Sequence, residues 1–348
     1  MIKDLFQRGQ QMLLDEAALA ESGKSGKLRG GNTSMINEKG DIIGGCANLT
    51  YLRYKGISVD PVDSSKDLMF DAGRRNEDHW EQILNKSLPA HLTMLREEEI
   101  PTKWLTENGT DVTGRPDVVL CEDGKPVVGI ELKQSCSLWT ARDVLFQKKP
   151  KLAHMMQAAH YSWQLGCPFE LWYTGRSNFA VTGDWIKNLF PKAGQPGSEH
   201  CNYAYYKEGN INPKTRKPIK HKIDQTEYQL GLARKEPVSC EVLSVLPFTQ
   251  GYLLDLHDGV LYYKDAMIDE AGWMETIIKI EDIQRYYERI TEMETLNVVQ
   301  KEPKVLNADG SKGNFKASQY CALGDLCCGK CAGQPLDNWV DKVKVRNT

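Results

Sequence analysis

The chain has 348 residues, of which 41% are hydrophobic and 26% are charged, and its formal net charge is −3. This composition is that of a globular protein with one large domain or two modest ones. The negative balance argues against a general nucleic-acid coat, although it leaves room for a local basic channel. No segment approaches the roughly 20 apolar residues of a membrane span, so we expect no membrane partner.

The beginning of the chain, Met-Ile-Lys-Asp-Leu-Phe-Gln-Arg, lacks the apolar stretch of a signal peptide. We therefore expect a cytoplasmic setting, in which thiols stay reduced. The chain has ten cysteines. In such a compartment this number favours metal ligation or burial over disulfides.

Two segments of different character open the chain. Residues 1–22 place apolar side chains among charges and are predicted to form an amphipathic helix. Residues 23–33 are rich in Gly, Ser and Lys and predict a flexible linker. Cys46 then precedes a short predicted helix that carries aromatic and basic side chains.

Residues 67–84 predict a highly charged helix that contains Gly73 and Glu77. His79 lies two positions after Glu77, so it faces roughly 200° away from it on a helix. We take Glu77 as the first candidate for a functional role and His79 as the second. A solvated polar helix face is the plainer alternative for the whole segment.

The most informative stretch runs from Gly114 to Lys133. Two short apolar runs flank an Asp-Gly turn at 122–125, which is typical of a β-hairpin. Asp117 begins the first run, and Glu131 lies near the end of the second, so an antiparallel pairing makes them neighbours. Glu131 and Lys133 are two positions apart on a strand and therefore point to the same side.

Two carboxylates and an amine thus converge on one spot of the predicted sheet. Paired carboxylates suit a hard cation such as Mg²⁺ or Mn²⁺, which leaves further positions to water and phosphate. A lysine beside them can orient a water molecule or stabilise a developing anion. The alternative is an ordinary hairpin with a solvated Asp and a Glu/Lys pair at the strand end.

The segment after this hairpin continues toward a helix. Leu138 and Trp139 are expected to pack onto the core. Lys148 and Lys149 belong to a short cationic run and are candidates for contact with nucleic acid. Pro150 suits the first turn of the helix that follows.

That helix is predicted over residues 154–166, and a strand follows over 169–174. Gln157 and Tyr161 are four positions apart and share a face, which His154 joins from three positions before Gln157. These polar side chains make the shared face a candidate functional surface. A semi-buried polar stripe is the alternative.

The second half of the chain carries fewer signals. Residues 192–222 are rich in Gly, Pro, Asn and Lys, and their most basic part contains Lys214, Arg216 and Lys217. Contact with phosphates and bases is one role for it, and a solvated loop insertion is equally compatible. Residues 240–264 predict a second hairpin with its turn at 257–259, and residues 275–296 predict a long helix.

Four cysteines lie within eleven residues near the C-terminus: Cys321, Cys327, Cys328 and Cys331. Only three ligands come easily from such a run, which makes Cys46 a candidate for the fourth. Thiolates favour an iron–sulfur cluster or zinc. Zinc held by the four late cysteines alone stays open as the alternative.

Three parts of the chain resemble motifs of PD-(D/E)XK nucleases: Gly114-x-x-Asp117, Glu131-x-Lys133 and Gln157-x-x-x-Tyr161. The last of them resembles a motif of the RecB-type subgroup, which includes CRISPR-adaptation nucleases and many phage exonucleases. Gly73-x-x-x-Glu77 is similar to the first motif of phage-type members, in which the glycine lets the helix pack closely and the Glu reaches the metal. One early and three late cysteines resemble the iron–sulfur members. The usual Pro-Arg after the early cysteine is missing, and the late spacing departs from that family's Cys-x-x-Cys-x5-Cys.

The resemblance implies an α/β fold with a central mixed sheet flanked by helices, a restriction-endonuclease-like core. It implies a Mg²⁺- or Mn²⁺-dependent DNA exonuclease in a bacterial or phage-infected cell. Asp117, Glu131, the Leu132 carbonyl and Glu77 would bind the metal. Lys133 would assist the attacking water, and Gln157 and Tyr161 would position the DNA backbone. A [4Fe–4S] cluster would tie the two ends of the chain together.

We divide the chain accordingly into an N-terminal helix and linker (1–35), the nuclease core (36–190), an insertion with an additional hairpin (191–265), and a C-terminal helix with the cysteine segment (266–348). A nuclease-like DNA-binding subunit without turnover and a site-specific endonuclease are the alternative functions. An oligomer is compatible with the resemblance, because related exonucleases can form rings.

Overall fold

The computed structural model describes residues 28–56, 64–96, 99–100, 102–135, 137–223, 238–298 and 305–306. The helix predicted over 1–22 lies outside the described residues, and so does the cysteine segment 321–331. Among the described residues, no helix is long and apolar enough to cross a membrane.

The fold is organised around a mixed seven-stranded sheet with the strand order β16-β15-β14-β9-β8-β7-β4. Its only parallel neighbours are β8 and β9, and every other adjacent pair is antiparallel. The bounds are β4 (Leu92–Arg96), β7 (Val118–Glu122), β8 (Lys125–Gln134), β9 (Phe169–Gly175), β14 (Phe248–His257), β15 (Val260–Asp265) and β16 (Met274–Lys279). The prediction of a mixed sheet flanked by helices is confirmed.

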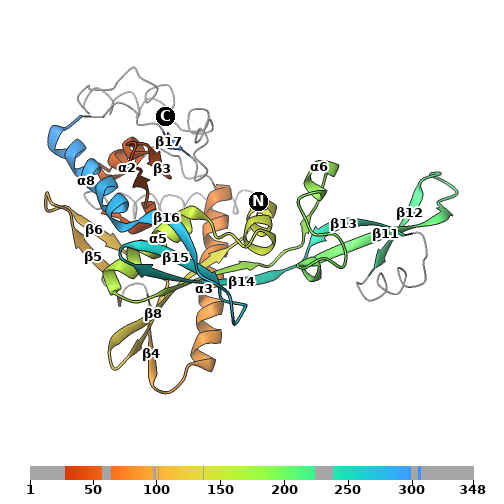
Figure 1. The fold of residues 1–348 in the computed structure, drawn as a ribbon, viewed down its shortest axis with the longest axis horizontal. Helices are drawn as coiled ribbons and strands as arrows, with labels where there is room; N and C mark the ends of the chain where they lie inside the picture. The colour runs from red at the N-terminus through yellow and green to blue at the C-terminus, as the bar shows by residue number, and fades with distance from the viewer. Residues whose placement is uncertain are drawn as a thin grey trace, which may run out of the picture.

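Two helices cover opposite faces of the centre of this sheet (Figure 1). Helix α3 (Ser64–Ser87) packs Trp80 and Leu84 against Ile130 and Leu132 of β8. Helix α5 (Leu152–Leu165) lies in the connection between β8 and β9 and covers the other face. Both faces of strand β8 are buried from Gly129 to Leu132, because each face lies under a helix.

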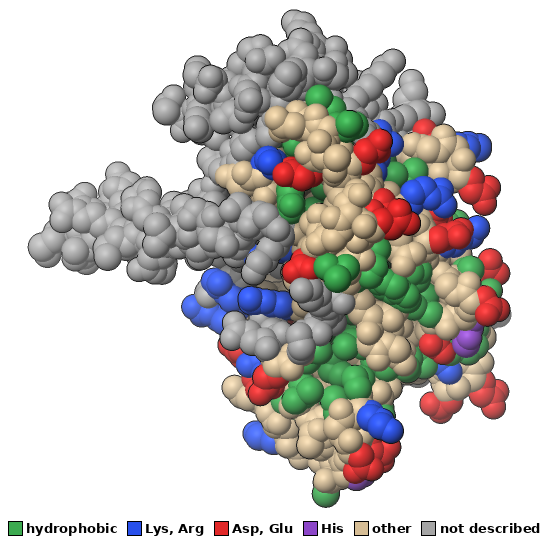
Figure 2. All heavy atoms as spheres, turned by 90° about the vertical axis from the view of Figure 1, so that its left-hand side faces the viewer, with side chains coloured by type: hydrophobic (Ala, Val, Ile, Leu, Met, Phe, Trp, Pro, Cys, Tyr) green, Lys and Arg blue, Asp and Glu red, His purple; other side chains and the backbone are tan. Residues whose placement is uncertain are grey.

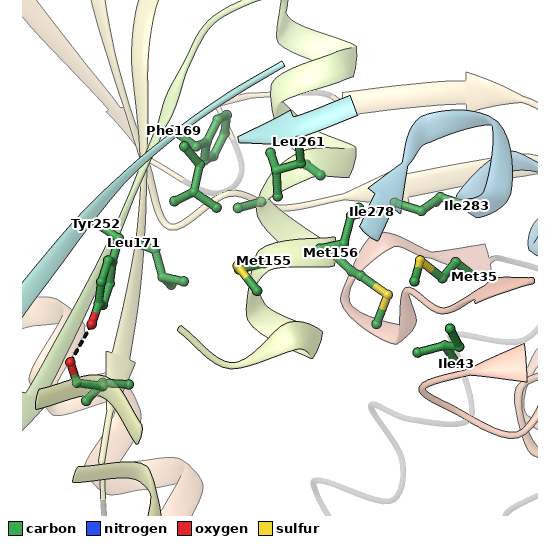
Figure 3. Packing of buried hydrophobic residues seen from close by; sticks show 14 of the residues in the cluster. Met35, Ile43, Met155, Met156, Phe169, Leu171, Tyr252, Leu261, Ile278 and Ile283 are labelled. Carbon is green, nitrogen blue, oxygen red and sulfur yellow. Dashed lines mark hydrogen bonds between the residues drawn. The ribbon is translucent and has the colours of Figure 1, made fainter. Parts of the chain in front are cut away.

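The side of the sheet under α5 forms the main hydrophobic core (Figure 3). Met155 and Met156 of α5 lie between the sheet residues Phe169 and Leu171 and the N-terminal residue Met35. The hydroxyl of Tyr252 donates to the carbonyl of Val144, which ties the sheet to the connection before α5. The core therefore joins segments that lie far apart in the sequence.

The chain between β8 and α5 forms helix α4 (Leu138–Ala141) and a π-helical turn, η2 (Arg142–Phe146). Helix α2 (Ala47–Tyr54) packs against α8 (Ile280–Leu296). Helix α6 (Asp184–Lys187) and the 3-10 turn η3 (Ser198–His200) lie between β10 and β11.

Three smaller sheets surround the main one. The first contains β1 (Leu28–Arg29), β6 (Asp111–Gly114) and β5 (Thr102–Leu105), and the second β17 (Val305–Leu306), β3 (Ile42–Ile43) and β2 (Met35–Ile36). The third contains β10 (Phe179–Ala180), β13 (Val238–Val245), β11 (Cys201–Ile211) and β12 (Pro218–Ile223). Strands β11 and β12 form a ribbon that extends away from the main sheet (Figure 1).

Both predicted hairpins are present, and their turns show why. Asp123 and Gly124 between β7 and β8 have φ of 51° and 75°, and Asp258 and Gly259 between β14 and β15 have φ of 51° and 77°. An Asp-Gly pair with two positive φ values is the type I′ turn that matches the twist of a two-residue hairpin.

Three elements of the structure differ from what the sequence predicts. Within the predicted linker 23–33, the described residues form regular structure. Leu28 is buried, β1 pairs with β6, and the 3-10 turn η1 (Gly30–Asn32) follows. Pro150 lies before the helix, which begins only at Leu152. The helix predicted over 275–296 begins at Ile280, because residues 274–279 extend as β16 along β15.

Candidate active site

The hairpin β7–β8 brings the two candidate carboxylates together. Val118 pairs with Ile130, so the residue before it, Asp117, lies beside Glu131. Oδ2 of Asp117 accepts a hydrogen bond of 2.6 Å from the backbone amide of Leu132. This bond fixes the Asp117 carboxylate against the strand that carries Glu131.

Glu131 is fully buried, and only one of its two oxygens has a hydrogen-bond partner. Oε1 accepts a hydrogen bond from Nζ of Lys133, while Oε2 is buried without a partner among the described residues. Burial, and then the charge of Asp117, raise the pKa of the Glu131 carboxyl to about 8. A buried carboxylate oxygen without a hydrogen-bond partner destabilises the folded state unless a nearby positive charge compensates it.

Lys133 is the nearest compensating charge. Burial lowers its pKa, but the charges of Glu131 and Asp117 outweigh that effect and hold the pKa above its usual value. The lysine is therefore a cation at neutral pH. One ammonium faces two carboxylates, and Glu77 adds a third negative charge that raises the pKa of Glu131 further.

Helix α5 and strand β9 supply a polar wall on the same side. The hydroxyl of Tyr161 accepts hydrogen bonds from Nε2 of Gln157 at 3.3 Å and from the backbone amide of Arg115 at 3.4 Å. Nδ1 of His154 is 3.0 Å from the hydroxyl of Tyr173. Burial, and then the charge of Lys133, lower the pKa of His154 to about 3, so its ring is neutral at neutral pH.

Sequence reasoning missed Tyr173. It pairs with Lys133 in the parallel register of β8 and β9, and this register places it on the side of the sheet that carries Glu131. The alternation of the predicted strand 169–174 could have indicated its face but not which residue of β8 it would adjoin.

Glu77 reaches the site from α3, where its neighbour Asn76 anchors the helix. Asn76 is buried, and its Oδ1 accepts a hydrogen bond of 3.0 Å from the hydroxyl of Thr174 on β9. His79 is exposed and lines an open cavity of about 440 Å³ together with Trp80 and Phe248. The two candidates on α3 thus lie in different surroundings.

The close packing expected at Gly73 is absent. Apart from its chain neighbours and the backbone of its own helix, no described atom lies within 4 Å of the position that a Cβ would take there. A close approach occurs instead at Gly129 of β8, where a Cβ would come within 2.2 Å of the ring of Phe169. Gly129, where packing excludes a larger side chain, therefore lies on the strand that carries Glu131.

The cations proposed to contact nucleic acid fall into two places. Lys148 is tied to the sheet by Asp265 and by Gln250, each at 3.0 Å, whereas Lys149 is exposed. The exposed side chains of Lys214, Arg216 and Lys217 lie at the tip of the β11–β12 ribbon, far from the carboxylates (Figure 1). On the side that carries β5, β6 and α8, acidic and basic side chains are interspersed around apolar ones (Figure 2).

Cys46 is partly exposed and immediately precedes α2. The chain beyond α8 returns to this region, because Leu306 of β17 pairs with Ile43 of β3. Cys321, Cys327, Cys328 and Cys331 lie outside the described residues. Among the residues that the structure describes, no three His, Cys, Asp or Glu side chains form a group able to hold a metal ion.

No model of a known protein family matches this chain, and a search of curated proteins finds no match to it. The site is defined by its own chemistry. Two adjacent carboxylates and one lysine lie where a β-hairpin meets a parallel strand, with a third carboxylate near enough to shift the pKa of Glu131.

Proposed function

We propose that the protein is a metal-dependent deoxyribonuclease of the PD-(D/E)XK, RecB type, with a restriction-endonuclease-like core. The observation that supports this most is the buried, unpartnered Oε2 of Glu131 beside Asp117. A divalent cation compensates such an oxygen, because it offsets both the lost hydration and the repulsion between the carboxylates.

Asp117 and Glu131 would hold Mg²⁺ or Mn²⁺, with the Leu132 carbonyl and Glu77 as further contacts. No group of three such side chains is preformed among the described residues. Mg²⁺ is commonly held by one or two carboxylates and keeps water and substrate phosphate in the other positions. When bound, the ion makes a water more acidic and offsets charge on the scissile phosphate.

The other residues of the site have roles that follow from their contacts. Nζ of Lys133 carries a proton at neutral pH and can stabilise negative charge that develops on the phosphate. Gln157 and Tyr161 present an amide and a hydroxyl that can position the DNA backbone. The neutral His154 adds no further positive charge next to Lys133.

The β11–β12 ribbon is proposed as a contact for the DNA duplex. Asn212 organises its tip, because its Oδ1 accepts hydrogen bonds from the amides of Lys214 at 2.9 Å and Thr215 at 3.2 Å. The turn therefore displays Lys214, Arg216 and Lys217 as a group. A two-stranded ribbon fits the major groove of B-DNA, and its cations can pair with phosphates.

A nuclease assay on strands labelled at the 5′ or the 3′ end tests this proposal. With Mn²⁺, an exonuclease shortens the strands progressively from one end, and EDTA stops the reaction. Discrete internal fragments would identify a site-specific endonuclease instead. Binding without any cleavage would leave a nuclease-like DNA-binding subunit.

We propose further that Cys46 and three of the four C-terminal cysteines hold a [4Fe–4S] cluster. The cluster would link the two ends of the chain. The pairing of β17 with β3 supports this, because it brings the chain back to within three residues of Cys46 before the cysteine run begins. Anaerobically purified protein should contain iron and acid-labile sulfide, and Cys46→Ala should lose both. Colourless protein with bound zinc would reject the cluster.

A further inference from the structure

Two tryptophans lie exposed and in contact at the surface near the end of β8. Trp139 of α4 is 42% exposed and Trp185 of α6 is 63% exposed, and their ring centroids are 5.6 Å apart with an angle of 32° between the planes. The expectation that Trp139 packs onto the core is wrong, because Leu138 and Ala141 take the inward positions of this single helical turn. Large aromatic rings left in water at one spot indicate a binding surface.

Trp139 is held in place by its surroundings. The guanidinium of Arg142 lies 4.8 Å from the centre of the Trp139 ring. Arg142 is in turn paired with Asp143, which also pairs with Lys151 at the start of α5. The backbone amide of Trp139 donates a hydrogen bond of 3.2 Å to the hydroxyl of Ser137. Trp139 therefore has a cation beside its ring and a backbone tied to Ser137.

The two tryptophans belong to the same end of the sheet as the carboxylates. The chain leaves β8 after Gln134. The backbone amide of Ser135 then donates a hydrogen bond of 2.6 Å to the carbonyl of Thr174 near the end of β9. Trp139 follows Lys133 by six positions, so their Cα atoms are at most about 22 Å apart even for a fully extended chain. A strand of a few nucleotides can therefore reach both.

We propose that Trp139 and Trp185 form a stacking platform for the bases of an unpaired DNA strand that enters the carboxylate site. This inference rests on the proposed nuclease function and adds the substrate form, a single strand or a frayed end. Stacking suits such an enzyme because every base has a π-face, so the contact tolerates any sequence. At 5.6 Å the rings leave no room for a base between them, which would require about 6.8 Å, twice the base-stacking spacing. The bases therefore stack on an outward face.

The chain offers a matched control in Trp273, which precedes β16. It is 42% exposed, as Trp139 is, and Nζ of Lys264 lies 5.0 Å from its ring centre. It thus has the same exposure and the same kind of cation contact. However, it lies beside the edge strand β16, which three strands separate from β8.

The experiment measures the affinity of the full chain for a fluorescent 20-nucleotide oligothymidine by anisotropy, in EDTA so that no strand is cleaved. Trp139→Ala and Trp185→Ala should each weaken binding between about 5- and 100-fold. Trp185→Phe should restore part of the loss, because it keeps a stacking face. Trp273→Ala should leave the affinity unchanged, and circular dichroism checks that each variant is folded.

Two results would overturn the inference: unchanged affinity in both Trp139→Ala and Trp185→Ala, or an equal loss in Trp273→Ala. The outcome is separable from that of the nuclease proposal. Strand binding that depends on the two tryptophans in a protein that never cleaves DNA would refute the nuclease alone, whereas cleavage with unaffected strand binding would refute the platform alone.

Discussion

The carboxylate of Asp117 accepts a hydrogen bond from the backbone amide of Leu132. Through this contact, the residue before β7 is fixed against the residue that follows Glu131 in β8. The two carboxylates are therefore held together by the backbone of a hairpin and not by flexible side chains. Such a preorganised pair of carboxyl groups is suited to bind a cation without rearrangement of the sheet.

Divalent metal should stabilise the folded protein through this pair. At a free Mn²⁺ concentration a hundred times the dissociation constant, the expected gain in the free energy of unfolding is about 2.7 kcal/mol. Thermal unfolding with Mn²⁺ and with EDTA measures this gain. Asp117→Asn and Glu131→Gln should abolish the shift in Tm, whereas Asp78→Asn, an exposed carboxylate on α3, should keep it. An undiminished shift in both site variants would place the metal elsewhere.

Gly129→Ala should destabilise the fold. The added methyl group would lie 2.2 to 2.4 Å from three ring atoms of the buried Phe169, so the ring or the strand must move. Overpacking of this kind costs about 1–3 kcal/mol in the free energy of unfolding. Urea denaturation measures the change.

The same substitution at Gly73 is the control for Gly129. Gly73 lies within α3 with open space beside it, so Gly73→Ala should stabilise the helix by up to about 1 kcal/mol. Equal destabilisation by the two substitutions would contradict this account of their surroundings.

Protonation of His160 should lower the free energy of unfolding in mildly acidic solution. Its ring is buried, Nε2 accepts a hydrogen bond of 2.7 Å from Gln164, and burial lowers its pKa to about 4. The unfolded chain takes up a proton near pH 6.5, before the folded state does, so the stability present above that pH is lost as the pH falls toward 4. Between pH 7.5 and 5 the loss is about 2 kcal/mol.

His160→Phe isolates this contribution, because it keeps a ring and removes the titration. The variant is expected to be less stable than the wild type at pH 7.5, and its deficit should shrink by about 2 kcal/mol at pH 5. Urea denaturation at the two pH values measures both differences. A deficit that does not change with pH would show that the His160 ring does not titrate on unfolding in this range.

The ribbon tip should contribute to the salt dependence of duplex binding. Lys214, Arg216 and Lys217 changed together to Ala should lower the slope of log K against log salt by up to about 2.7, which corresponds to three phosphate contacts. The matched control changes three exposed lysines elsewhere, Lys39, Lys86 and Lys125. An equal loss of slope in both triple variants would assign the effect to net charge instead of the ribbon.

The local features of the site could be predicted from the sequence. Asp123 and Gly124 specify the turn between β7 and β8, and a shift of one residue in the register between Leu120 and Cys121 then brings Asp117 opposite Glu131. The face shared by Gln157 and Tyr161 follows from helical spacing alone. Each of these depends only on residues that are close in the sequence.

The features that the sequence did not reveal depend on distant segments. Glu131 is buried because α5 and β9 cover it, and nothing in the Glu-x-Lys motif indicates which of its oxygens stays without a partner. Residues 275–279 are predicted to be helical, yet they pair with β15 as part of β16, where Ile278 is buried. The contact of Trp139 with Trp185 depends on where α6 lies.

The most direct test of the central claim compares Lys133→Ala with the wild type on end-labelled DNA in Mn²⁺, together with DNA affinity measured in EDTA. If Asp117, Glu131 and Lys133 form one hydrolytic site, the wild type should degrade the strand. The variant should lose cleavage by at least about 100-fold, while its DNA affinity stays within about threefold, because one cation of many phosphate contacts is removed. Cleavage at the wild-type rate in Lys133→Ala would contradict the assignment.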